Sequence, residues 1–227
     1  MISNTLNLEP VKLLLDKHKQ HYLPYDIQFK DIVLRIHPDV FNPSYTKVSG
    51  FIADHVHIPQ DSDVLDMFTG SGAIGLYTAR NARFVLGIDI SEKAIACANE
   101  NADLLGLKNK TEFRVGNLWE SVRRNEQFDV IIANPPLLPA IPENLLEMAV
   151  ADGPEMALTK SFIEGATIHL KNNGVIIMAL SNACKPYVGD PIAFVSYIAL
   201  KSGLTANVKA EWDVGYEIYR IIEFTKK

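Results

Sequence analysis

The sequence has few of the residues from which disulfide frameworks and metal sites are built. Its 227 residues include two cysteines, Cys97 and Cys184, and neither belongs to a CxxC pair. The six histidines lack the spacing of metal ligands. His55 and His57, two residues apart at the end of an expected helix, would point to different faces. We therefore expect no disulfide and no metal site.

Long apolar runs are missing as well. No run reaches the roughly 18 residues that a membrane-spanning helix needs, and the polar stretch from Met1 to Pro10 has no signal-peptide core. We therefore expect a cytoplasmic protein without a membrane partner. The net charge is -5, and dense runs of Lys and Arg are lacking. This balance favours a protein or a small molecule over a large structured RNA as the partner.

Short apolar segments rich in Val and Ile alternate with helical patterns along most of the chain. Such segments are typical of strands buried on both faces of a parallel sheet. The expected strands are 64–67, 84–90, 113–115, 130–133 and 175–179, and the expected helices are 73–79, 92–105, 162–170 and 191–201. Two extended runs, 205–212 and 217–224, predict a hairpin. The pattern predicts an α/β fold with a doubly wound, mostly parallel, seven-stranded sheet and a C-terminal antiparallel hairpin.

Residues 1–43 precede the first strand–helix unit and are expected to form an N-terminal extension to a domain that spans 44–227. A helix is expected at 11–18 and a short strand at 32–36, and a helix over 44–56 then leads into the first core strand. Gly106 and Gly174 stand where two of the core helices should stop.

A strand that runs into a turn of small residues gives the main functional signal. The stretch VLDMFTGSGAIG occupies 64–75, and Gly70 and Gly72 allow its backbone to approach a ligand closely. The helix that follows directs free N–H groups at the same place. A second strand then ends in Asp89, where an acid accepts hydrogen bonds from ribose hydroxyls. This order of elements predicts a nucleoside site.

Two residues of the loop favour S-adenosylmethionine over a nicotinamide dinucleotide. A dehydrogenase loop usually has the pattern GxGxxG, with its glycines against a pyrophosphate. Here Phe68 occupies the first glycine position, and Asp66 stands at the strand end. A carboxylate there would repel a pyrophosphate but suit the ammonium group of a methionine moiety.

The segment FTGSGA at 68–73 resembles motif I of the class I methyltransferases, which have a Rossmann-like fold. The resemblance implies that Asp66 lies near the methionine ammonium and that Asn117 meets the adenine amine, where many relatives have Asp. An Asn could accept that hydrogen bond through its side-chain oxygen. The implied cofactor residues are Asp66, Phe68, Thr69, Gly70, Gly72, Asp89, Ile90, Asn117, Leu118 and Asn134.

The fourth core strand runs directly into Asn134, Pro135 and Pro136. Two prolines make a stiff turn without two of its N–H donors, so backbone carbonyl groups are left free. The Asn134 side-chain oxygen and the Pro135 carbonyl could bind the two hydrogens of a planar –NH2 group and aim the nitrogen at the sulfonium methyl. Such a site predicts N-methylation by in-line displacement, with Asn134 and Pro135 as the catalytic residues.

This segment resembles motif IV, Asn-Pro-Pro-aromatic, of amino-group methyltransferases. The family includes release-factor glutamine methyltransferases and N-methyltransferases of bases in RNA and DNA. Leu137 departs from the motif, because the usual residue there is an aromatic that stacks on a flipped base. The implied acceptor residues are Asn134, Pro135, Pro136 and Leu137.

Two further segments resemble the glutamine-modifying group. ADGPEMAL at 151–158 is similar to its Asp-Gly-Gly segment, and VFNPS at 40–44 is similar to its Phe-x-Pro element. Three acceptors stay open: a protein glutamine, a nucleobase amine in RNA and a small metabolite. A Rossmann-like oxidoreductase or a pure binding protein is the alternative of a different class. We expect residues 1–43 to help cover the acceptor pocket, and the sequence predicts no oligomeric state.

Overall fold

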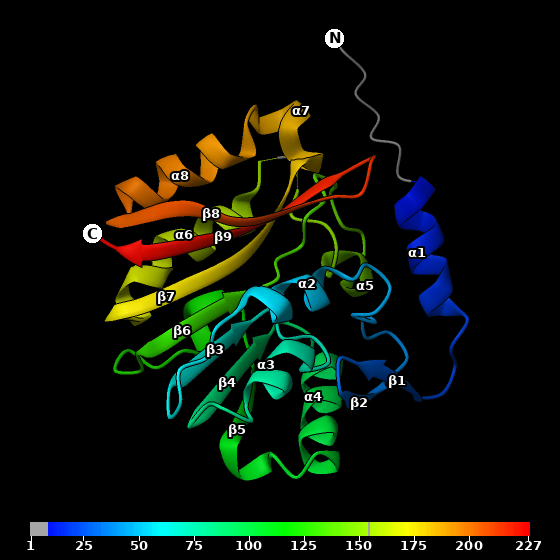
Figure 1. The fold of residues 1–227 in the computed structure, drawn as a ribbon. Helices are drawn as coiled ribbons and strands as arrows, with labels where there is room; N and C mark the ends of the chain where they lie inside the picture. The colour runs from blue at the N-terminus through cyan, green and yellow to red at the C-terminus, as the bar shows by residue number, and fades with distance from the viewer. Residues whose placement is uncertain (1–8, 154) are drawn as a thin grey trace.

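The computed structural model describes residues 9–153 and 155–227 (Figure 1). Most of the polar stretch 1–10 lies outside the described residues, and so does Pro154 of the segment 151–158. Among the described residues, no helix is long and apolar enough to span a membrane. Within the same ranges, no group of three or more His, Cys, Asp and Glu side chains could hold a metal ion.

A seven-stranded sheet forms the middle layer, with the strand order β5-β4-β3-β6-β7-β9-β8 (Figure 1). Its strands are β3 (Asp63–Met67), β4 (Phe84–Asp89), β5 (Thr111–Val115), β6 (Phe128–Ala133), β7 (Leu170–Ser181), β8 (Leu204–Asp213) and β9 (Ile218–Lys226). Strands β3 to β7 pair in parallel, and β9 runs antiparallel to both β7 and β8. The predicted fold class, including the C-terminal hairpin, is confirmed.

Helices cover both faces of the sheet. One face packs against α2 (Val48–His55), α3 (Ala73–Thr78) and α4 (Glu92–Leu104), and the other against α6 (Ala157–His169) and α8 (Pro191–Lys201). The remaining helices are α1 (Glu9–Lys19), α5 (Leu145–Met148) and α7 (Lys185–Val188), with short 3-10 turns η1 (Lys108–Lys110), η2 (Leu118–Ser121) and η3 (Asn182–Cys184). This arrangement leaves the ends of the parallel strands open between the two helix layers.

Strand β6 explains why the core strands are apolar without interruption. Val130 and Ile132 belong to the hydrophobic cluster on one face, whereas Ile131 and Ala133 belong to the cluster on the other. All four are 0% exposed. Burying each of the larger side chains stabilises the fold by roughly 1.5–3 kcal/mol, so a polar residue at any of these positions would be costly.

Some local predictions were wrong. The helix expected over 44–56 begins only at Val48, because Lys47 has a left-handed backbone with φ 58°. Gly174 is no helix stop: it lies inside β7, and a Cβ there would lie 3.0 Å from two carbonyl oxygens at the start of β6. Gly106, in contrast, follows α4 with φ +67° as predicted.

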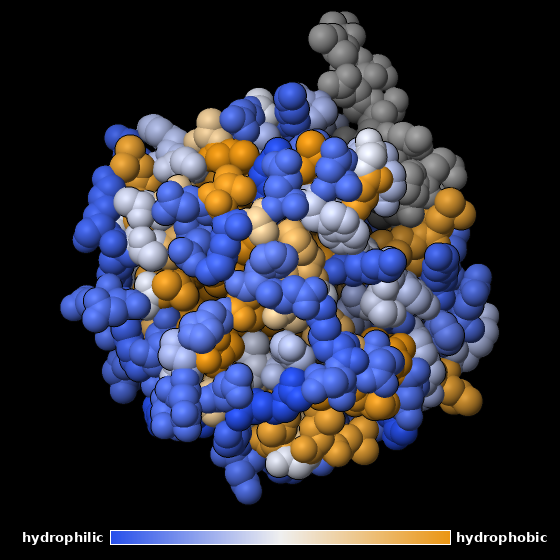
Figure 2. All heavy atoms as spheres, viewed as in Figure 1, coloured by the Kyte–Doolittle hydropathy of each residue, from blue (hydrophilic) through white to orange (hydrophobic). Residues whose placement is uncertain are grey.

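The N-terminal extension contains a two-stranded sheet in addition to α1. Strand β1 (Tyr25–Phe29), which the sequence analysis missed, pairs antiparallel with β2 (Ile32–Ile36). Helix α1 is held by His18, which is 4% exposed and packs its ring 5.0 Å from that of Phe41 and 4.7 Å from that of Tyr45. Hydrophilic side chains cover much of the face in Figure 2. Leu13 of α1 is an exposed apolar residue, with 63% of its surface accessible.

Candidate active site

A cavity opens along the edge of the sheet where the parallel strands end. Its volume is about 630 Å³, which falls within the roughly 300–1,000 Å³ of small-molecule sites. The wall begins at the loops after β3, β4 and β5, passes the end of β6 and reaches the turn between β8 and β9. Ligands bind at this edge in open α/β sheets.

The loop between β3 and α3 has a backbone shape that favours glycine. Phe68, Gly70 and Gly72 have φ values of 63°, 56° and 81°, and the Thr69 N–H donates to a β4 carbonyl oxygen at 3.0 Å. Phe68, Thr69 and Gly70 line the cavity, but Gly72 does not. A Cβ at Gly72 would lie 3.2 Å from the Cβ of Ala98, so this glycine allows α4 to pack against the loop.

Asp66 lies beneath the loop and not in the cavity, contrary to its predicted place beside a ligand ammonium. It is 1% exposed. Its Oδ2 accepts hydrogen bonds from the Thr69 hydroxyl at 2.6 Å and from the Gly75 N–H at 2.9 Å. Burial raises the pKa of Asp66 to about 6, although both hydrogen bonds lower it. Because these bonds turn the carboxylate inward, the acid braces the loop.

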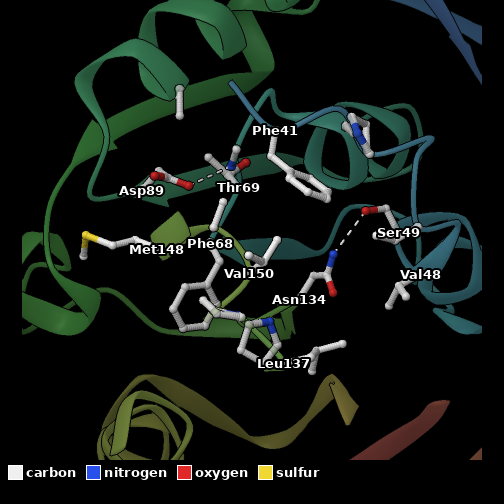
Figure 3. Close-up of a pocket in the computed structure, with 18 of the residues that line it drawn as sticks. Phe41, Val48, Ser49, Phe68, Thr69, Asp89, Asn134, Leu137, Met148 and Val150 are labelled. Carbon is white, nitrogen blue, oxygen red and sulfur yellow. Dashed lines mark hydrogen bonds between the residues drawn. The ribbon is translucent and has the colours of Figure 1, made fainter. Parts of the chain in front are cut away.

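Asp89 stands at the end of β4 and faces the cavity (Figure 3). Its Oδ2 accepts a hydrogen bond from the Gly70 N–H at 2.9 Å, and its Oδ1 accepts one from the Ser91 N–H at 2.9 Å. Burial raises the pKa of the Asp89 carboxyl above its ordinary value. Each carboxylate oxygen can accept a second hydrogen bond, so Asp89 can still bind two donors from a ligand.

Three residues form the next part of the wall. Ile90 is 44% exposed, Asn117 precedes η2, and Leu118 has a left-handed backbone with φ 51°. All three line the cavity. Two apolar side chains with an amide beside them suit a flat ring that has a polar edge.

Asn134 follows β6 and lies in the same cavity. Its Nδ2 donates a hydrogen bond to the Oγ of Ser49 at 3.1 Å (Figure 3). Ser49 is 4% exposed and belongs to the first turn of α2. The bond leaves the Oδ1 atom of Asn134 free to accept an incoming N–H. Pro135 and Pro136 line the cavity next to it.

The segment after the two prolines closes on itself beside the cavity. The Leu138 N–H donates to the Val150 carbonyl at 2.9 Å, and the Asp152 N–H donates to the Leu138 carbonyl at 2.9 Å. The Asp152 carboxylate accepts hydrogen bonds from the N–H and hydroxyl of Thr159, at 3.1 and 2.5 Å, and so caps α6. Leu137 and Val150 therefore occupy fixed places in the wall (Figure 3).

Two segments far from these loops in the sequence complete the wall. The extension contributes Leu13, Leu14, Lys17, Asp39, Val40, Phe41 and Pro43. The C-terminal hairpin contributes Trp212, Val214, Tyr216, Glu217 and Tyr219. Both segments border the same cavity as the loops after β3, β4 and β5.

Comparison with known proteins identifies the family. The profile of a family described as methyltransferase domain matches residues 58–215, which are most of the chain and include the loops after β3, β4, β5 and β6. The chain belongs to this methyltransferase family. Its cofactor is S-adenosylmethionine, so the nicotinamide alternative is not retained.

Several relatives of this methyltransferase modify glutamine in proteins. It is 30% identical over 135 residues to a release factor glutamine methyltransferase of Aliivibrio fischeri, a match that covers 58% of this chain and 47% of the relative. It is 29% identical over 158 residues to a Methanocaldococcus jannaschii chain provisionally named a protein N5-glutamine methyltransferase, covering 66% and 76% of the two chains. The chain thus spans about half the length of the first of these relatives.

Solved structures with the same fold act on RNA and on protein. A 16S rRNA guanine-N2 methyltransferase of T. thermophilus, solved with S-adenosylmethionine and guanosine, matches with a TM-score of 0.67, 16% identity and coverage of 90% of this chain and 50% of that one. An E. cuniculi complex that methylates a translation termination factor matches with a TM-score of 0.59, 17% identity and coverage of 83% and 99%. Both likenesses concern the fold of this methyltransferase.

The cavity brings together all the predicted site residues of this methyltransferase except Asp66 and Gly72. Sequence reasoning missed Ser49, whose hydroxyl is 85 residues from its partner Asn134 in the chain. It also missed Trp212 and Tyr219, which are apolar positions of a hairpin and carry no motif. Their aromatic side chains in the predicted C-terminal hairpin were the one feature of the sequence that could have indicated them.

Proposed function

We propose that this methyltransferase transfers the methyl group of S-adenosylmethionine to the side-chain amide nitrogen of a glutamine in a protein. The observation that carries the proposal is the placement of Asn134. Its amide lies in the same cavity as the cofactor loops, and Ser49 holds its Nδ2 at 3.1 Å. The Oδ1 atom is thereby left to accept an N–H from a planar amide.

In this proposal the cofactor lies along the loops after β3, β4 and β5. The backbone of Thr69 and Gly70 holds the methionine part, and the Asp89 carboxylate accepts hydrogen bonds from the ribose hydroxyls. Asp66 and Gly72 act indirectly: the acid braces the loop, and the glycine lets α4 approach it.

The adenine would lie between apolar side chains beyond the ribose. Ile90 and Leu118 enclose its faces, and the Asn117 side-chain oxygen accepts a hydrogen bond from its amine. Phe68, which also lines the cavity, closes the inner end of the site.

The acceptor amide would be held by two oxygens. The Asn134 Oδ1 and the Pro135 carbonyl each accept one N–H, which aims the nitrogen lone pair at the methyl carbon. The N–C bond forms while the C–S bond breaks, its electron pair stays on sulfur, and the methylated nitrogen releases one proton to water. Because an amide nitrogen is a weak nucleophile, positioning and charge stabilisation must supply most of the rate.

Two observations favour a protein glutamine over other acceptors. The net charge of -5 gives little general attraction to a polyanion. Relatives that span a large part of the chain methylate glutamine. We further propose that residues 1–43 cover the acceptor side of the domain formed by 44–227.

A base amine in RNA is the second candidate. Lys17 and Lys47 line the cavity and could contact a phosphate. Relatives of this chain also include RNA methyltransferases. The two candidates differ in the molecule that carries the methyl group, which an experiment can establish directly.

The test is methyl transfer from labelled S-adenosylmethionine into a fractionated cell extract. We expect label in protein that resists ribonuclease and yields methylglutamine after enzymatic digestion. Asn134→Ala should lower kcat by about 100-fold or more, because one of the two oxygens that orient the acceptor is lost. Ser49→Ala removes only the support of that amide and should cost about 10-fold, and Ser49→Thr should restore most of the rate.

Calorimetry with S-adenosylhomocysteine provides the control. Affinity should change by less than about twofold in Asn134→Ala, because the proposed loss concerns the acceptor. Label in RNA would favour the second candidate, and label in small molecules would contradict both. Equal losses of rate and of cofactor affinity would make Asn134 a structural residue.

A further inference from the structure

The cavity continues beyond Asn134 along the edge of the sheet. Strand β6 is followed laterally by β7, β9 and β8, and residues from the turn between β8 and β9 line the far part of the wall. Ala133 at the end of β6 pairs with Met178 of β7. Three residues further along β7, Ser181 pairs with Tyr219 of β9. The hairpin tip therefore extends beyond the end of β6 (Figure 1), and residues from it line the cavity.

This far part of the wall is aromatic. The Trp212 ring lies 5.8 Å from that of Tyr219 and 5.8 Å from that of Phe51. Both Trp212 and Tyr219 line the cavity. At the motif position where relatives place their ring, this chain has Leu137, which packs into the same hydrophobic cluster as Trp212. The cavity thus has aromatic rings, but from a different element.

The aromatic wall is held in place from two sides. The Tyr219 hydroxyl donates a hydrogen bond to Glu217 at 2.6 Å, and Glu217 also accepts one from the Ser181 hydroxyl. Helix α2 contacts both Asn134 and the aromatic wall: its Ser49 accepts a hydrogen bond from Asn134, and its Phe51 packs against Trp212. Trp212 is the half-buried member of the wall and offers a flat face to a planar group.

We propose that Trp212, backed by Tyr219, is the specificity-determining residue of the acceptor site and takes the place of the missing motif aromatic. The planar amide that Asn134 binds at its edge would lie with its face against the indole. This assignment rests on the proposed function, because it presupposes a planar nitrogen acceptor. It gives the C-terminal hairpin a role in recognition as well as in closing the sheet.

The test compares three variants of the full chain on the methyl-accepting fraction from the labelled extract. Trp212→Leu keeps an apolar side chain without the ring and should raise the apparent KM for the acceptor about 10-fold, with a smaller effect on kcat. Trp212→Phe keeps a ring and should stay within about threefold of the parent chain. Trp119→Phe is the matched control, because the other tryptophan stacks between Phe162 and His169 and does not line the cavity.

The possible results distinguish the assignment of Trp212 from the proposed function. An acceptor KM that is unchanged in Trp212→Leu overturns the assignment of Trp212 and leaves the proposed function in place. Parallel losses of acceptor KM, thermal stability and S-adenosylhomocysteine affinity in both Trp212 variants would make the residue structural, which also overturns the assignment. Absence of methyl transfer by the parent chain to any fraction refutes the proposed function, and this inference with it.

Discussion

Single residues of the loops proposed to hold the cofactor could be placed at the cavity from the sequence because they lie in contiguous motifs. Gly70 follows β3 and Asp89 ends β4, two strands with clear apolar patterns, and the two residues meet through a hydrogen bond of 2.9 Å. Asp66 was placed wrongly, because sequence order puts it at a strand end but cannot say which way its carboxylate turns. Ser49 was missed because its importance comes from one long-range contact with Asn134.

The substitution Asp89→Ala tests the ribose contact proposed for this residue. The substitution should weaken S-adenosylhomocysteine binding by about 1–3 kcal/mol, because hydrogen bonds of a carboxylate to the ribose are lost. Calorimetry measures the effect. Asp89→Asn, which keeps the shape and one acceptor oxygen, should lose less. Unchanged affinity in Asp89→Ala would remove the ribose contact from the proposal.

Elements of the core were predicted better than those at its margin. Helix α8 was placed at its observed bounds, since Asp190 caps it and a proline opens it. Strand β1 was missed although its sequence YDIQF alternates apolar and polar residues, because only one of its side chains, Phe29, is fully buried. Strand β7 was predicted over 175–179 only. Its first residues directly follow α6 and include the polar Lys171, Asn172 and Asn173, which do not have the apolar pattern of a buried strand.

The attachment of α1 should depend on pH. Burial, with a smaller contribution from nearby His21, lowers the pKa of His18 to about 4, below its ordinary value of about 6.5. The unfolded chain therefore binds more protons than the folded one between these values. Stability should fall as the pH drops from about 6.5 toward 4, by at most about 3 kcal/mol.

Urea unfolding and hydrogen exchange of the α1 amides at pH 7 and pH 5 test this expectation. His18→Phe retains a ring between Phe41 and Tyr45 but cannot be protonated, so it should show a smaller loss at pH 5. His57→Gln removes an exposed histidine and should behave like the parent chain. An equal loss in His18→Phe would assign the pH dependence to other groups.

At the scale of the whole molecule, the strand order determines what lies next to what. The carboxyl ends of β4, β3 and β6 meet at one edge, which joins Asp89, Gly70 and Asn134 although they are far apart in the chain. This part followed from the sequence, because parallel sheets bring such ends together. How the extension folds back over the same edge depends on tertiary packing and was stated only as an expectation.

Removal of residues 1–20 tests that expectation. The shortened chain loses Leu13, Leu14 and Lys17 from the cavity wall but keeps every loop proposed to hold the cofactor. We expect the acceptor KM to rise about fivefold or more, because apolar contact area is lost, with S-adenosylhomocysteine affinity within about twofold. An unchanged acceptor KM, or a loss of cofactor binding, would contradict the proposed cover.

Four of the seven non-glycine residues with positive φ among the described residues line the cavity: Asp39, Lys47, Phe68 and Leu118. A left-handed backbone costs an ordinary residue of the order of 1 kcal/mol, and glycine would relieve that cost at each place. Glycine would also remove a side chain from the cavity wall and make the backbone there more flexible. At these four positions, a substitution that raises thermal stability would therefore also change the shape of the cavity.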